Sequence, residues 1–279
     1  MRFAFKTSPQ NTTWGAMLDV WRAADDIELF ESGWTFDHFY PIGDNDPAGS
    51  CLEGWTTLTA LAQATRRLRM GTLVTGIQYR HPAVLANMAA TLDIISGGRL
   101  ELGIGAGWNQ LESGAYGIEL GTPRERSDRF EEACEVLTGL LGPQETTTFS
   151  GSYYTLTGAM CNPGPVQQPH PPICIGGSGE KRTLRTAARF ADHWNFVGGT
   201  PVQFSHAREV LHQHCSDIGR DPADILLSSH VPFTGDPAGT AATAAALGEA
   251  GAQLAIVYLR PPLSAAVLEP LAAALSELS

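Results

Sequence analysis

Short apolar runs alternate with longer amphipathic stretches along the whole chain. Eight runs have the length and residue types of strands, and each is followed by a stretch in which apolar residues recur with helical spacing. The expected strands are Arg2–Lys6, Trp34–Asp37, Leu68–Thr75, Leu100–Ile104, Ile173–Gly176, Asp192–Val197, Ile225–Val231 and Gln253–Leu259. The expected helices lie near Trp14–Glu31, Glu53–Thr65, Pro82–Ile95, Arg124–Leu141, Gly179–Ala191, Pro201–Ile218, Pro237–Ala250 and Ala265–Leu278. Strict alternation of strand and helix requires right-handed parallel crossovers, and eight repeats are the number that closes a barrel. The pattern therefore predicts the α/β class and a (β/α)8 TIM barrel, with an open doubly wound sheet as the alternative.

One segment, 143–172, interrupts this rhythm with many Pro, Gly and Thr residues. Within it, Thr146–Thr157 has the pattern of a β-hairpin that turns at Ser150 and Gly151. We expect this segment to be an insertion between the fourth helix and the fifth strand that lies over the barrel mouth. Because barrels of this class reach the length of this chain as one unit, we expect a single domain over residues 1–279.

The charge of the chain excludes one class of partner. A formal net charge of -11 at pH 7 repels phosphate backbones, and the positive residues form no basic stripe, so nucleic acid is not expected. The five cysteines are odd in number and include no Cys-x-x-Cys pair, so neither a disulfide framework nor a metal site is indicated. No signal core and no stretch of about 18 apolar residues occurs, which predicts a cytoplasmic protein without a membrane partner.

Two residues after the second strand are the first candidates for chemistry, because loops at the C-terminal ends of barrel strands build the active sites of this fold. Asp37 and His38 stand there. Imidazole titrates near neutral pH, so His38 is a candidate general acid or base, and Asp37 could accept a hydrogen bond from a cofactor ring or orient its neighbours. The alternative is structural: Asp37 caps the loop and His38 only packs.

The loops after the third and fourth strands carry less specific signals. The residues after the third strand are Tyr79, Arg80, His81 and Pro82. Proline suits the first turn of the next helix, and the two basic residues before it are typical of a helix cap or a surface contact. After the fourth strand, Gly105 and Gly107 let a backbone or a cofactor approach closely, and Trp108 supplies a flat apolar wall. Tight packing inside a barrel would explain the glycines as well.

The loop after the fifth strand resembles an anion site. Gly176, Gly177, Ser178 and Gly179 lead directly into the next expected helix. Backbone N–H groups at a helix N-terminus bind phosphate, glycines leave them accessible, and the serine adds a hydroxyl donor. The alternative is a plain glycine-rich turn. The spacing matches neither a Walker loop nor a G-x-G-x-x-G fingerprint, which argues against a nucleoside triphosphate or a Rossmann-type dinucleotide.

With these motifs in place, the sequence resembles the luciferase-like monooxygenase superfamily, and within it the branch of deazaflavin (coenzyme F420)-dependent oxidoreductases. The resemblance covers nearly the whole chain. Its carriers are Phe36–Phe39, Gly71–Gly76, Tyr79–Ala83, Ile95–Arg99, Leu102–Trp108, Tyr116–Gly117 and Ile175–Gly179. Together these motifs are specific for the superfamily and less specific for the cofactor.

The resemblance implies that a flavin-type ring lies in the barrel mouth, with its phosphate near Gly177, Ser178 and Gly179. It also implies that Asp37 contacts the cofactor and that His38 has an acid/base role. The other residues expected at the cofactor are Thr72, Leu73, Thr75, Gly105, Gly107 and Gly176, and Tyr79 and Trp108 are expected on the substrate side. Relatives often hold a non-prolyl cis peptide after the third strand, which falls near Thr72–Leu73 in this chain.

The chain departs from one group of these relatives. In the sugar-phosphate dehydrogenases of this family a catalytic glutamate follows the Gly-x-Gly after the fourth strand, where this chain has Trp108. The difference argues against a sugar phosphate and favours an aromatic, less polar substrate pocket.

The resulting hypothesis is hydride transfer between coenzyme F420 and a small, apolar or conjugated organic substrate, with His38 moving the proton. An FMN-dependent monooxygenase that uses reduced flavin and oxygen is the first alternative, and a non-catalytic cofactor-binding barrel is the second. Relatives of this kind are often dimers, and the apolar surface of the outer helices would permit a homodimer. A flavin or F420 reductase would be a natural partner.

Overall fold

The computed structural model describes residues 1–43, 46 and 48–278, and within them strands and helices alternate from end to end. The strands are β1 Arg2–Thr7, β2 Phe30–Asp37, β3 Arg69–Gly76, β4 Leu100–Gly105, β5 Thr147–Ser150, β6 Thr155–Ala159, β7 Ile173–Gly176, β8 His193–Phe196, β9 Leu226–Pro232 and β10 Leu254–Leu259. The α-helices are α1 Trp14–Asp25, α2 Gly54–Ala64, α3 Pro82–Ser96, α4 Gln110–Ala115, α5 Pro123–Leu141, α6 Thr183–Phe190, α7 Pro201–Asp217, α8 Pro237–Glu249 and α9 Leu268–Ser276.

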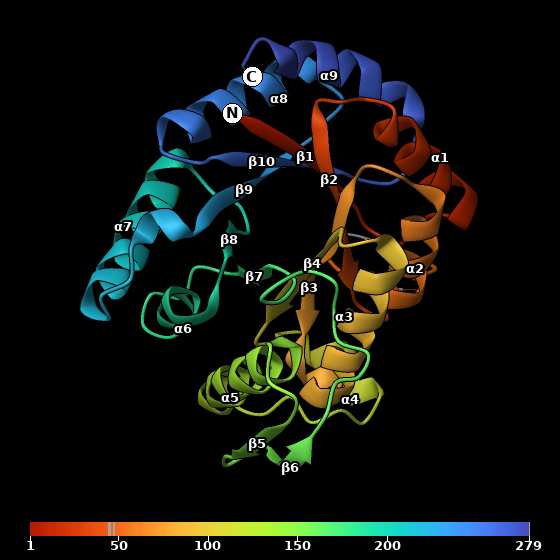
Figure 1. Ribbon diagram of the computed structural model, residues 1–279. Coiled ribbons are helices and arrows are strands. Elements are labelled where there is room, and N and C mark those ends of the chain that lie inside the picture. Colours follow the sequence, from red (N-terminus) through yellow and green to blue (C-terminus); the bar gives the residue numbers. More distant parts are fainter. Residues whose placement is uncertain (44–45, 47, 279) are drawn as a thin grey trace.

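Eight of the strands form a closed barrel in the order β1-β10-β9-β8-β7-β4-β3-β2. All neighbours in the barrel are parallel, and β1 pairs with both β2 and β10, which closes the ring. Helices surround the barrel, and the two chain ends lie side by side on its outside (Figure 1). There the amino terminus of Met1 donates a hydrogen bond to the carbonyl of Leu278 at 2.9 Å. The predicted TIM barrel is therefore confirmed.

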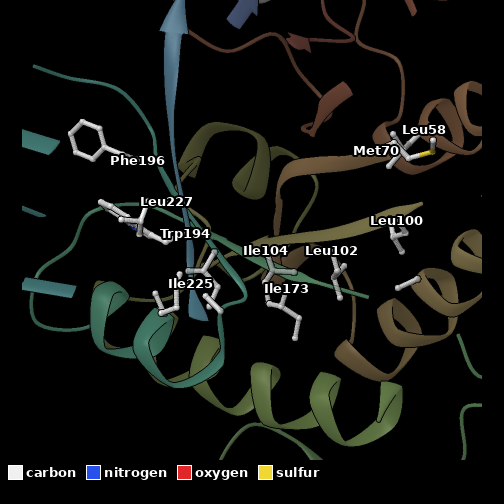
Figure 2. Packing of buried hydrophobic residues seen from close by; sticks show 14 of the residues in the cluster. Leu58, Met70, Leu100, Leu102, Ile104, Ile173, Trp194, Phe196, Ile225 and Leu227 are labelled. Atoms are coloured by element: carbon white, nitrogen blue, oxygen red, sulfur yellow. The ribbon is translucent and has the colours of Figure 1, made fainter. Parts of the chain in front are cut away.

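Two apolar layers hold the barrel together. The larger lies between the strands and the helices, and Figure 2 shows part of it, with Leu102, Ile104 and Ile173 packed on the helix side of their strands. The smaller fills the barrel interior with Trp34 and Ile256 among its members. This alternation of inward and outward side chains follows from the two-residue period of a strand. No helix in the described part of the chain is long and apolar enough to cross a membrane.

The first helix is shorter than the sequence predicts, and the second strand is longer. Helix α1 ends at Asp25 and β2 already begins at Phe30. Ser32 and Gly33, which directly follow the predicted helix and have the residue types of a helix stop, lie inside this strand. A Cβ on Gly33 would lie 2.7 Å from the Trp21 ring, so the glycine is needed for close packing of α1 on β2. The prediction mistook a packing glycine for a helix end.

The insertion forms the predicted hairpin, but it does not lie over the barrel mouth. Strands β5 and β6 pair antiparallel, beside α5 and away from the barrel centre in Figure 1. The Glu132 carboxylate of α5 accepts hydrogen bonds from backbone N–H groups 152 to 154 at the hairpin turn. Further on, Gln167 contacts Asp93 and the Leu100 carbonyl, at the opposite end of the barrel. The expectation was wrong because the hairpin finds its partners along the outer helices.

Candidate active site

A cavity of about 400 Å³ opens where the barrel strands end, within the usual range for a small-molecule site. Its walls come from β1 to β4 and β7 to β9 with the loops that follow them. The lining residues are Lys6, Phe36, His38, Ile42, Leu73, Val74, Gly76, Tyr79, Gly105, Ala106, Gly107, Trp108, Gly176, Gly177, Thr183, Asn195, Val197 and His230. Most of the predicted site residues are among them, whereas Asp37, Thr72, Thr75, Ser178 and Gly179 are not.

A buried carboxylate holds the predicted acid/base residue in place. His38 Nδ1 lies 2.5 Å from Glu112 Oε1, and the Tyr79 hydroxyl donates to the same oxygen. The other oxygen accepts the backbone N–H of Phe39 at 2.9 Å. Glu112 is fully buried, and it reaches the site from α4, whose first turn is capped by the Asn109 side chain. Three groups from two loops thus converge on one carboxylate.

This arrangement fixes which nitrogen of His38 faces the cavity. Burial opposes ionisation of Glu112, but hydrogen bonds from His38 and Tyr79 outweigh it, so the pKa of Glu112 lies below its usual value. An ionised carboxylate only accepts hydrogen bonds, so Nδ1 carries a proton and Nε2 is the atom left for chemistry. Burial and the Glu112 carboxylate raise the pKa of Tyr79, which keeps its hydroxyl protonated. Trp108 packs edge-on against His38, with ring centres 5.5 Å apart.

Asp37 lies behind the cavity wall, where it forms an ion pair. Both of its oxygens accept hydrogen bonds from Arg80, which also binds Glu53 at the start of α2 at 2.6 Å. Asp37 is fully buried, and burial raises its pKa despite the Arg80 guanidinium. Arg80 therefore ties its own loop to both ends of the loop between β2 and α2 and is not a surface contact, while His81 does cap α3 through the Ala83 N–H. In this structure Asp37 supports the loop that carries His38.

Thr72 and Thr75 also lie behind the wall. Their hydroxyls are 2.9 Å apart, and the Thr75 hydroxyl accepts the Trp55 indole N–H at 2.9 Å. Between them the chain presents Leu73 and Val74 to the cavity. The peptide between these two residues is cis, one position later than the sequence comparison suggests, and it is the one non-prolyl cis peptide in the described ranges.

Two glycines on neighbouring strands leave Val74 uncovered. A Cβ on Gly105 would lie 2.8 Å from the Val74 side chain, and one on Gly176 would lie 3.0 Å from it. Glycine at both positions leaves room for the Val74 side chain, which lines the cavity with its apolar surface. Gly107 has a φ of +80°, and a Cβ there would meet the Gln78 amide at 2.0 Å. Close contacts with Val74 and Gln78 thus require glycine at all three positions.

The expected anion loop is longer than predicted, because the helix after it begins later. Helix α6 begins at Thr183, four residues later than predicted, and its first turn has no side-chain cap. The N–H of Gly177 is already used, because it donates to the Asn195 carbonyl at 3.1 Å. Ser178 and Gly179 are exposed, and a Cβ on Gly179 would lie 2.9 Å from the Thr183 hydroxyl. The loop therefore offers Ser178, Gly179 and the uncapped start of α6 beside the cavity.

Two titratable residues of the cavity were not predicted from the sequence. Lys6 of β1 is only 7% exposed, and its ammonium donates to the Leu73 carbonyl at 3.0 Å. His230 of β9 donates from Nδ1 to the Val197 carbonyl at 3.1 Å, and its buried Nε2 has no partner among the described residues. Burial and the nearby Lys6 hold the pKa of His230 well below its usual value. Both residues stand at inward positions of their strands. The alternation of inward and outward side chains along each strand could have predicted these positions.

A buried polar network lies under the cavity. Glu101 binds Arg69 at 2.8 Å and His193 at 3.2 Å, and His193 in turn binds the Ser228 hydroxyl at 2.6 Å. Burial would raise the pKa of Glu101, but these partners lower it to about 2. Ser228 also accepts the Asn195 amide at 2.8 Å, which connects the network to the cavity floor. It fixes the orientation of polar groups that would otherwise destabilise the barrel interior.

Comparison with known proteins gives a consistent family. The family model described as luciferase-like monooxygenase matches residues 1–271. Among curated proteins, phthiodiolone/phenolphthiodiolone dimycocerosates ketoreductases are similar: that of Mycobacterium kansasii is 36% identical over 180 residues, covering 63% of this chain and 48% of that protein. That of Mycobacterium bovis is 37% identical over 176 residues, covering 62% and 45%. The matched segments thus span about half the length of these relatives.

Solved structures share the fold. An F420-dependent secondary alcohol dehydrogenase in complex with an F420-acetone adduct superimposes with a TM-score of 0.83 at 20% identity, covering 97% of this chain and 98% of that one. The coenzyme F420-dependent tetrahydromethanopterin reductase from Methanopyrus kandleri gives 0.80 at 18% identity, covering 99% of both chains. A monooxygenase from Streptomyces bottropensis also gives 0.80, at 20% identity, covering 99% and 97%. Identities this low establish the fold only.

Proposed function

The chain belongs to the luciferase-like monooxygenase family, and from this premise we propose that it is a coenzyme F420-dependent oxidoreductase acting on a small, apolar or conjugated alcohol or carbonyl compound. The observation that carries the proposal is the cavity with His38 held by Glu112 on one side and the uncovered Val74 surface between Gly105 and Gly176. An imidazole held in place by a buried carboxylate can transfer the proton. An apolar surface beside it can hold the redox ring that transfers the hydride to or from the same substrate.

The cavity fits a flat ring with a phosphate-bearing tail. Leu73, Val74 and the two glycines beside Val74 would hold the ring, and Ser178, Gly179 and the uncapped start of α6 would hold the phosphate. A deazaflavin, when bound there, supplies a carbon that gives or accepts a hydride. Asp37, Thr72 and Thr75 support this wall from behind through the Arg80 ion pair and the Trp55 hydrogen bond.

The residues of the chain would divide the remaining work. Nε2 of His38 takes the proton from a substrate hydroxyl, or gives it to a carbonyl oxygen in the reverse direction. Glu112 fixes the imidazole orientation and stabilises its charged form, and Tyr79 donates to the same Glu112 oxygen. Trp108 and Phe36 line the cavity and give it an apolar surface that excludes water. A ketoreductase among the relatives and an alcohol dehydrogenase among the structural neighbours support this substrate class.

We expect the purified protein to bind coenzyme F420 with a dissociation constant in the micromolar range or below, and to bind it more tightly than FMN. Ser178→Glu, which places a negative charge in the anion loop, should weaken binding at least tenfold because it repels the phosphate. The measurement is a fluorescence titration with each cofactor. Ser216→Glu, at an exposed position of the outer helix α7, is the matched control and should leave both constants unchanged.

Each other outcome of this titration has a defined meaning. Tighter binding of FMN would replace the proposal with a flavin-dependent monooxygenase. A protein that binds neither cofactor would remove the cofactor assignment altogether. Equal binding by wild type and Ser178→Glu would keep the cofactor but place its phosphate elsewhere.

A further inference from the structure

Lys6 is a buried cation without a counter-charge. Its ammonium can donate three hydrogen bonds, yet the structure gives it one acceptor, the Leu73 carbonyl, together with the face of Tyr258 at 5.0 Å. No carboxylate of the described residues forms an ion pair with it. Burying an ammonium in this way is costly, and a chain with a net charge of -11 has many carboxylates that could have neutralised it. The missing counter-charge therefore points to a ligand.

We propose that Lys6 stabilises the negative charge that the ring of the bound cofactor acquires on reduction, and so sets the reduction potential of that cofactor. The inference rests on the proposed function, because it requires a redox ring in the cavity. It assigns to Lys6 a role distinct from those of His38 and Glu112, which handle the substrate proton. Lys6 would act on the cofactor and not on the substrate.

The position of Lys6 next to the ring surface carries this assignment. The carbonyl that accepts its hydrogen bond belongs to Leu73, the residue directly before Val74. Val74 carries the uncovered surface between Gly105 and Gly176 against which a flat ring would lie. Lys6 also lines the same cavity. A ring held against Val74 would therefore lie in the same cavity as the Lys6 ammonium, which bonds the residue before Val74.

The charge balance of the reaction shows what the ammonium would do. In the oxidative direction the substrate C–H bond breaks, its hydrogen and electron pair go to the ring carbon, and the hydroxyl proton goes to His38. The substrate is oxidised to a carbonyl compound, and the ring gains one unit of negative charge with the hydride. A cation beside the ring favours this charged form over the oxidised form. The same preference holds when the reaction runs in reverse.

The surroundings of Lys6 let it respond to this charge. Burial lowers the pKa of Lys6 to about 7, so a small change in its environment alters its protonation near neutral pH. The titratable groups that face it are His230 of β9 and Tyr258 of β10, and Arg260 lies over the other part of the Tyr258 ring at 5.4 Å. None of them is a carboxylate. An anionic ring would be the first counter-charge that Lys6 meets.

The test compares wild type with Lys6→Met by two readouts that do not depend on turnover. The first is the ratio of the dissociation constants for oxidised and reduced coenzyme F420, together with the potential of the bound cofactor. We expect Lys6→Met to weaken binding of the reduced form relative to the oxidised form by at least tenfold, which corresponds to a potential about 30 mV lower for a two-electron couple. Arg22→Met, which removes an exposed cation from the outer helix α1, should change neither the ratio nor the potential.

The second readout is the ¹⁵N signal of the Lys6 ammonium in protein labelled with ¹⁵N-lysine, which contains only Lys6 and Lys181. We expect the pKa of Lys6 to rise by at least one when the reduced cofactor binds. The proposal would be overturned if the ratio of dissociation constants in Lys6→Met stayed within twofold of wild type and the potential stayed within about 10 mV. If the wild type binds no redox cofactor, the proposed function fails and this inference with it, so the two failures are distinguishable.

Discussion

Replacing Lys6 with methionine is expected to raise the free energy of unfolding of the ligand-free protein by about 3 to 5 kcal/mol at pH 6. Methionine has nearly the shape of lysine without the charge. Burial lowers the pKa of Lys6 from 10.5 to about 7, and a pKa difference of one corresponds to about 1.4 kcal/mol. The lost hydrogen bond to the Leu73 carbonyl, worth about 1 kcal/mol, offsets part of the gain. Urea unfolding measures the difference.

The gain should depend on pH in a defined window. Below pH 7 the lysine is charged in both the folded and the unfolded chain, so the full cost of burying the ammonium is present. Between pH 7 and about 10.5 the unfolded chain holds a proton that the folded protein has lost, so the stability of the wild type rises with pH. The advantage of Lys6→Met should thus fall below about 1 kcal/mol by pH 10.

Lys181→Met is the matched control for this stability measurement, because Lys181 is exposed and is the only other lysine of the chain. Its effect on the free energy of unfolding should be near zero at every pH. An equal stability of wild type and Lys6→Met at pH 6 would show that Lys6 is not a buried ammonium in solution. The redox role proposed for it would then lose its physical basis.

The barrel could be predicted from sequence because its signals are local and repeated. Each strand is a short apolar run and each helix has its own spacing, so single errors at α1 and β2 did not change the count of eight. The boundary between α1 and β2 failed for a non-local reason. Gly33 is required by contact with Trp21 on the preceding helix, and no local pattern distinguishes such a glycine from a helix stop.

Site residues could be predicted from the sequence only where they lie close after the end of a strand. His38 directly follows β2, Trp108 is the third residue after β4, and both line the cavity. Glu112 stands on α4, a six-residue helix that the hydrophobic pattern did not reveal. Only the fold places it in contact with His38, which lies 74 positions earlier in the sequence. Asp37 stands at the right place in the sequence, but its partner Arg80 turns it away from the cavity. Partners distant in sequence therefore decide which of the candidate side chains face a ligand.

Glu112→Gln is expected to lower the turnover number by about 100-fold, because general acid–base catalysis contributes on this order and depends on a correctly oriented imidazole. The amide lacks the charge that stabilises protonated His38. The amide also has only one oxygen, so it cannot accept all the hydrogen bonds that His38, Tyr79 and Phe39 donate to the two carboxylate oxygens. The measurement follows coenzyme F420 turnover with a panel of small ketones and secondary alcohols. The dissociation constant of the cofactor should stay within about threefold of wild type, because Glu112 does not line the cavity.

Two further variants separate this positioning role from a loss of fold. Glu119→Gln changes an exposed carboxylate seven residues later and should leave turnover unchanged. Tyr79→Phe removes one donor to Glu112 but keeps the carboxylate on His38, so its effect on turnover should be no more than about tenfold. A Glu112→Gln protein that is folded, binds the cofactor and turns over at the wild-type rate would show that His38 does not need its carboxylate partner. The proton-transfer role of His38 would then have to be given to another group of the cavity, and His230, whose buried Nε2 has no partner among the described residues, would be the next to test.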